Sequence, residues 1–193
     1  MLKFAAIAPV AFIVAGCHLG ESRERSGSTV RPEELKLDSP ASPSATLVIG
    51  DREIPVTVNS EVIGKLLSVR TFADNAEIEH EGYRIEPDAF LLIQAGGETF
   101  DPPLPVLKFP LRIGDGWTWS GTLRAGEASS PADAKVATIR ESLFTPQSEA
   151  LRVNVELTLR RGAGSKRNLS FWFLEGRGLV QREFGASIRR PRN

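Results

Sequence analysis

A ten-residue segment with strict alternation of apolar and polar side chains constrains the fold of this chain most. Residues 151–160 read L-R-V-N-V-E-L-T-L-R, with an apolar residue at every second position. Successive side chains of a β-strand point to opposite faces. The pattern therefore predicts a strand with one face in a core and the other in solvent.

Neighbouring segments repeat this pattern and predict an antiparallel meander. Residues 136–143 alternate in the same way, and glycine-containing turns join the segment 151–160 to further strands at 168–174 and 179–184. Shorter strands between residues 46 and 95 are separated by turns containing Gly, Asn or Asp. We therefore predict an all-β fold, either a curved antiparallel meander sheet or an open half-barrel.

A proline-rich stretch lies between the two blocks of strands. Prolines occupy positions 102, 103, 105 and 110, and a G-D-G turn and two tryptophans, Trp117 and Trp119, follow. Proline fixes φ and cannot donate a backbone hydrogen bond. We predict that residues 102–110 form an extended crossover within one sheet system, and that the tryptophans begin the regular half of the meander.

The composition divides the chain into four parts. We predict a signal peptide at residues 1–16, and a modified Cys17 followed by a flexible tether at residues 17–45, which are rich in Ser, Pro, Gly and charged residues. Residues 46–187 form a single all-β domain, and residues 188–193 form a basic tail. A domain of this size buries enough surface to fold without a disulfide.

The N-terminal residues carry a first resemblance. A short apolar run, residues 4–14, is too short to span a bilayer and ends in Val14-Ala15-Gly16-Cys17. This pattern resembles the lipobox of bacterial lipoprotein signal peptides, which implies that Cys17 is lipidated on sulfur and becomes the first mature residue. The alternatives are an ordinary secretory signal with a chance cysteine, or a structural cysteine. His18 stands where an Asp would resemble an inner-membrane retention signal, which favours the outer membrane, facing the periplasm, in a Gram-negative host.

Two motifs carry a second resemblance. Residues 109–117 read F-P-L-R-I-G-D-G-W, and residues 172–180 read W-F-L-E-G-R-G-L-V. They resemble a loose family of bacterial extracytoplasmic β-proteins of unknown function with Pro-Leu-x-x-Gly-x-x-Trp and Trp-Phe-x-x-Gly-x-Gly-Leu-Val motifs. The resemblance implies an antiparallel curved sheet and no established activity. Leu174-Glu175 departs from the Ala-Pro that the family often has there.

The inventory of reactive side chains argues against common enzyme classes. The chain has two histidines, His18 and His80, and one cysteine, Cys17, so a Ser-His-Asp triad could use only His80 and a thiol nucleophile is absent once Cys17 is modified. No set of zinc ligands has a recognisable spacing. It has no phosphate-binding loop, and its formal net charge is zero, which gives no attraction to nucleic acid. We predict a protein without catalytic activity, cofactor or nucleic-acid partner, with a carboxylate-dependent hydrolase as a minor alternative.

Charged residues are distributed unevenly. Glu77, Glu79 and Glu81 share one face of a predicted strand and require water, cations or opposing arginines. A metal site there matches no calcium-loop spacing, so we predict none. From residue 151 onward the chain has ten Lys or Arg and three Asp or Glu. These basic strands either contact anionic lipid or glycan or, the interpretation we favour, pair with the acidic strands at 77–88.

The aromatic residues are the only candidates for a ligand site that the sequence offers. Trp117, Trp119 and Trp172 either line a groove for an apolar ligand or belong to a covered core. The first functional hypothesis is a lipid-anchored binding or chaperone-like module of the cell envelope for an apolar or envelope-derived ligand, held on the membrane through Cys17. The alternative is a structural protein that docks another envelope component through its sheet edge or basic end.

Overall fold

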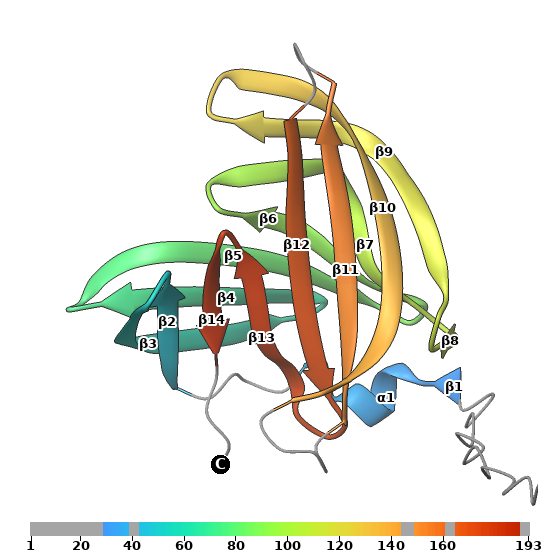
Figure 1. The fold of residues 1–193 in the computed structure, drawn as a ribbon, viewed down its shortest axis with the longest axis horizontal. Coiled ribbons are helices and arrows are strands. Elements are labelled where there is room, and N and C mark those ends of the chain that lie inside the picture. The colour runs from blue at the N-terminus through green and yellow to red at the C-terminus, as the bar shows by residue number, and fades with distance from the viewer. Residues whose placement is uncertain (1–28, 39–42, 144–148, 161–164, 190–193) are drawn as a thin grey trace, which may run out of the picture.

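A computed structural model describes residues 29–38, 43–143, 149–160 and 165–189 (Figure 1). The signal peptide, Cys17, His18 and residues 190–193 lie outside the described residues. Most of the described chain is a single antiparallel β-barrel. The all-β class predicted from the sequence is therefore confirmed.

Twelve strands form the barrel, each hydrogen-bonded to an antiparallel neighbour. Their order around it is β10-β11-β12-β13-β14-β2-β3-β4-β5-β6-β7-β9, and β9 pairs back with β10. Their bounds are β2 (Ser44–Ile49), β3 (Arg52–Ile63), β4 (Leu66–Ala73), β5 (Ala76–Glu86), β6 (Ala89–Ala95), β7 (Glu98–Lys108), β9 (Gly116–Ala125), β10 (Ala128–Ser142), β11 (Glu149–Leu159), β12 (Ser165–Leu174), β13 (Gly178–Phe184) and β14 (Ala186–Arg189).

The sheet closes, whereas the sequence predicted an open half-barrel or a curved sheet. The closing strand is β14, in which Ser187 pairs with Val48 and Ile188 with Leu47 of β2. The predicted basic tail thus begins inside a strand, and Ile188 is fully buried. The four residues Ala-Ser-Ile-Arg of β14 are too few to establish an alternating pattern, so the closing strand was missed.

The proline-rich stretch is a barrel strand, β7, and not a crossover. The predicted extended backbone is confirmed, but β9 pairs with β7 only over three residues that end at Asp101. Proline has no N–H to continue the ladder. Instead, Trp119 Nε1 donates to the Pro102 carbonyl at 3.0 Å and Trp117 Nε1 donates to the Pro105 carbonyl at 2.8 Å. The two indoles therefore join β9 to β7 where backbone pairing is lost.

The alternating segment at 151–160 forms β11, as predicted, and its apolar face lies in the core. Val153, Val155 and Leu157 are each at most 1% exposed. Across the interior, Tyr83 stacks on Phe90 at 4.8 Å between ring centroids, and Phe90 meets Phe173 edge-on at 5.8 Å. Aromatic side chains thus fill the middle of the barrel.

One end of the barrel is closed by residues 29–38, which we call the N-terminal plug. It contains β1 (Thr29–Val30) and α1 (Pro32–Leu35), which lie below one end of the barrel in Figure 1. Leu35 is 3% exposed and Leu37 5% exposed, because both join the barrel core. We predicted that this segment was part of a flexible tether with little to pack on. The structure shows instead that the barrel end supplies its packing partner.

Both motifs that carry the family resemblance contact this plug. In the first, Leu111 of β8 (Leu111–Arg112) pairs with Val30. In the second, the Gly176 N–H donates to the Glu34 carbonyl at 2.7 Å. Gly178 has φ +68°, and a Cβ there would lie 3.0 Å from the Lys36 carbonyl oxygen. The motifs thus form the closed end of the barrel.

Candidate functional site

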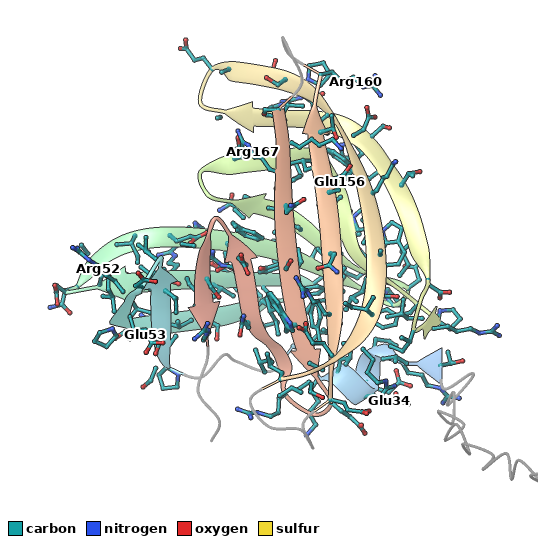
Figure 2. All side chains as sticks on the ribbon, in the orientation of Figure 1. Glu34, Arg52, Glu53, Glu156, Arg160 and Arg167 are labelled. Carbon is teal, nitrogen blue, oxygen red and sulfur yellow. The ribbon has the colours of Figure 1, made fainter. Side chains whose placement is uncertain are left out.

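The opposite end, which we call the mouth, contains a cavity of about 350 Å³. Hairpin turns surround it, because antiparallel neighbours turn alternately at the two ends. Its lining residues come from both walls of the barrel: Ala95, Gly96, Glu98, Phe100, Leu157, Arg167, Asn168, Leu169, Phe184 and Gly185. Figure 2 shows Arg167 on β12 near this end, far from Glu34 of α1 at the other end.

The floor of the mouth cavity is apolar. Phe100, Leu157 and Leu169 come from β7, β11 and β12, and each is less than 9% exposed. They face inward because the alternation of their strands places every second side chain in the barrel. Phe184 of β13 completes this surface and packs edge-on against Phe171 at 5.3 Å. The floor therefore suits an alkyl or aromatic group.

The rim of the cavity is charged. Arg167 Nη1 donates to both carboxylate oxygens of Glu98, at 2.7 and 2.8 Å. Glu98 belongs to β7 and Arg167 to β12, which are not neighbours in the barrel. The ion pair consequently spans the mouth. An apolar floor below a few fixed polar groups is the usual arrangement of a small-molecule site.

A buried ion network, formed by Glu79, Glu81, Tyr83 and Arg182, lies inside the barrel beside the cavity. Arg182 is 1% exposed; its Nε donates to Glu81 at 2.8 Å, and its Nη2 donates to Glu79. The Tyr83 hydroxyl donates to the second oxygen of Glu81 at 2.5 Å. Three strand-to-strand steps separate β13 from β3, and β5 is further still, so the network crosses the interior.

The network holds one cation for two carboxylates, and this imbalance shifts pKa values. Burial raises the pKa of Glu79, and Arg182 offsets this only in part while the like charge of Glu81 adds to it. Burial alone would lower the pKa of Arg182, but the carboxylates of Glu81 and Glu79 raise it overall. Arg182 therefore stays charged, and the raised pKa of Glu79 makes its carboxylate easier to protonate than a glutamate in water.

Two contacts connect this network to the cavity wall. The Gly96 backbone N–H, at the β6–β7 turn, donates to Glu79. The Arg182 guanidinium lies 4.7 Å from the centroid of the Phe184 ring. Gly96 and Phe184 both line the cavity. The network thus positions two opposite walls of the mouth.

The predicted tryptophan candidates lie elsewhere, in structural positions. Trp117 and Trp119 bridge β9 to β7, although Trp119 also contacts Phe100 of the floor at 6.1 Å between ring centroids. Trp172 packs in a small cluster with Ala150, outside the main core, where its Nε1 donates to Glu141 at 2.9 Å. Arg152 lies 4.8 Å above its ring. Each indole N–H thus serves the fold.

One of the C-terminal basic residues pairs with the acidic strand at 77–88, as we favoured from the sequence: Arg182 supplies the opposing arginine for Glu79 and Glu81. Arg167 pairs instead with Glu98, outside that segment. On the outer face, His80 lies within hydrogen-bond distance of Ser68 and Gln94, at 2.9 and 3.0 Å. Among the described residues, no group of three His, Cys, Asp or Glu side chains is placed to hold a metal ion.

Sequence reasoning missed the residues of the mouth. Alternation indicates which side chains of 151–160 and 168–174 point inward, but it does not show at which end the interior stays open. Arg182 carried a weak signal, since period-two alternation places it on the same strand face as the apolar residues Val180 and Phe184. A charge at such a position needs a buried partner.

No protein-family model, no curated protein and no solved structure matches the chain. Within the described ranges, no helix has the length and apolar character needed to cross a membrane. The site is therefore assigned from its geometry alone.

Proposed function

We propose that this chain is a lipid-anchored protein of the cell envelope whose barrel binds an apolar or envelope-derived ligand in the mouth cavity, without catalysis. The carrying observation is the apolar floor of Phe100, Leu157 and Leu169 below the Glu98–Arg167 rim. A cavity of about 350 Å³ is near the lower limit for small-molecule sites, so it accommodates one alkyl chain or one ring system.

The anchor is the second part of this proposal. Lipidation of Cys17, implied by the lipobox resemblance, would hold the protein on a membrane, the outer membrane in a Gram-negative host. A cysteine-to-alanine change tests it: Cys17→Ala should move the protein from the membrane fraction to the soluble periplasmic fraction. Retention of this variant in the membrane fraction would contradict the anchor.

The alternatives receive less support from the contacts. Docking of another envelope component through a free sheet edge is disfavoured because the barrel closes. Docking through free basic residues is disfavoured because Arg152, Arg167 and Arg182 have carboxylate partners. A carboxylate-dependent hydrolase would need a carboxylate that faces substrate. Glu81 is fully buried, with its oxygens bonded to Arg182 and Tyr83. Glu98 lines the cavity, but both of its carboxylate oxygens are bonded to Arg167.

Native mass spectrometry of protein purified from its host tests ligand binding. A co-purifying lipid or other apolar molecule is expected with the wild-type chain. Ala95→Phe should abolish it, because Ala95 lines the cavity as the last residue of β6. Ala125→Phe is the matched control, because Ala125 is the exposed last residue of β9 before an equivalent turn. Equal ligand content in both variants would place the ligand elsewhere, and a clean apo mass with a cross-linked partner would favour the docking alternative.

A further inference from the structure

The turn between β3 and β4 exposes an unusual concentration of apolar side chains. Six large apolar residues are strongly exposed among those described, and three of them lie within five residues here. Ile63 is 65% exposed, Leu66 49% and Val62 39%. We call these three residues the apolar tip.

The apolar tip presents apolar surface on both faces of the hairpin. Ile63 pairs with Leu66 on the outer face, and Val62 pairs with Leu67, whose side chain enters the core. Gly64, with φ +59°, allows the tight turn between them. A hairpin that is apolar on both faces can bury all of this surface only in an apolar medium that surrounds its end.

The tip lies at the closed end of the barrel. A hollow of about 550 Å³ is lined both by Gly64 and Lys65 of the turn and by Pro32 and Leu37 of the plug. Beside the tip, Lys65 and Arg84 both pair with Glu86, at 2.5 and 3.2 Å, so the cations of this group outnumber its carboxylate by one. No excess of negative charge in this group therefore opposes contact with a lipid surface.

The covalent length of the chain limits how far this end can be from a membrane anchor. Residues 17 and 29 are twelve positions apart, so a lipid on Cys17 lies at most about 40 Å along the chain from Thr29 of the plug. Strand β3 has 12 residues, about 40 Å along the chain, and connects the β2–β3 turn at the mouth end to the tip at the closed end, so its two ends lie at different distances from a membrane that the closed end faces.

We propose that the apolar tip inserts into the lipid surface to which Cys17 is anchored, and so orients the barrel with its mouth away from the membrane. This inference rests on the proposed lipid anchor. A single acyl chain or a small apolar contact binds membranes only weakly, and two combined signals give stable attachment. The tip is the second signal. It fixes orientation, and the lipid supplies attachment.

The test uses the full mature, lipidated protein in phosphatidylcholine vesicles. Lipidation consumes Cys17, the only native cysteine, so a thiol introduced by Ile63→Cys takes an environment-sensitive fluorophore alone. The control is Ile49→Cys, because Ile49 is 51% exposed at the end of β2, beside the opposite end of β3. Emission at position 63 should shift to the blue and be quenched by spin-labelled lipid, and emission at position 49 should not.

A charged variant sharpens the result. Leu66→Asp should abolish the shift at position 63, whereas Ile78→Asp, a similarly exposed residue of β5, should leave it intact. If the fluorophore at position 63 emits as it does in water, insertion of the tip is overturned. An equal emission shift at positions 49 and 63 overturns it as well. Flotation with the vesicles and the intact mass report the lipid anchor separately. Floating protein with an aqueous label therefore contradicts the tip alone, and protein that neither floats nor carries lipid contradicts the anchor.

Discussion

The two ends of this barrel are stabilised by different physical means. At the closed end the N-terminal plug adds buried apolar side chains and shares a backbone hydrogen bond with the glycine turn at residues 176–178. At the mouth, charged side chains hold the walls: a buried network around Arg182 and a rim pair between Glu98 and Arg167. The closed end is shaped by backbone fit, and the mouth by electrostatics.

This difference indicates where a cavity can persist. Backbone fit and apolar packing fill space, as Leu35 and Leu37 do below the barrel core. A charge network fixes side chains at a distance from one another and does not require that the space beside them be filled. The mouth therefore combines fixed walls with an open interior, which a binding site requires.

The largest expected effect is the loss of the buried cation at the mouth end. Arg182→Met leaves Glu79 and Glu81 buried without a counter-charge, and removal of one partner of a buried ion pair costs about 3–5 kcal/mol. Equilibrium unfolding in urea measures it. Arg189→Met, which removes an exposed arginine paired with Glu53 at 3.4 Å, is the control with little expected effect.

If the electrostatic interpretation is correct, removal of the whole charge network should restore stability. The triple variant with Arg182→Met, Glu79→Gln and Glu81→Gln should recover most of the loss, because no uncompensated charge remains. A triple variant as unstable as Arg182→Met would mean that the shape of Arg182, and not its charge, holds this part of the barrel.

A pair of glycine substitutions tests backbone fit at the closed end. Gly176 and Gly178 both have positive φ, so alanine costs about 1–2 kcal/mol at either position. A Cβ at 176 meets nothing within 4 Å, whereas at 178 it meets the Lys36 carbonyl at 3.0 Å. Gly178→Ala should therefore cost about 1–3 kcal/mol more than Gly176→Ala, because of overpacking against the plug.

Amide hydrogen exchange separates a displaced plug from general destabilisation. The Gly176 N–H donates to Glu34 of the plug, so its exchange should accelerate in Gly178→Ala more than that of core amides in β11. Equal losses of stability in the two alanine variants would show that the plug adapts freely and that the second motif serves only the turn.

The third prediction concerns pH and the mouth network. Burial raises the pKa of Glu79 in the folded state, so the folded protein holds this proton more tightly than the unfolded chain does. The stabilisation that protonated Glu79 gives is therefore present at low pH and is lost as pH rises through the raised pKa. Glu79→Gln should remove this dependence and make the protein more stable than wild type at neutral pH. Urea unfolding of both proteins across the acidic range measures the difference, with the exposed Glu77→Gln as control.

Much of the fold followed from the sequence, and the misses have common physical causes. Alternation predicted β11 and its buried face, because that pattern depends on one strand alone. Closure by β14 and docking of Leu35 depend on partners distant in sequence, which no local pattern encodes. Which residues line the mouth depends on the end of the barrel at which side chains stop filling the interior, and alternation along one strand does not show this. The pairing of Glu79 and Glu81 with an arginine could be anticipated by charge, but its location could not.

The smallest effect on stability is expected from a substitution in the rim pair of the mouth, Glu98 and Arg167. The Glu98–Arg167 pair is partly exposed, with 23% and 46% of the two side chains accessible, so Glu98→Gln should cost at most about 1 kcal/mol. The control is Glu149→Gln, which breaks a pair with Arg140 that also has a 2.7 Å contact but joins adjacent strands. Similar small losses in urea unfolding are expected from both. A rim variant as damaging as Arg182→Met would show instead that the pair belongs to a sealed core. The mouth would then be held as tightly as the closed end, and a ligand could enter only if the barrel walls separated.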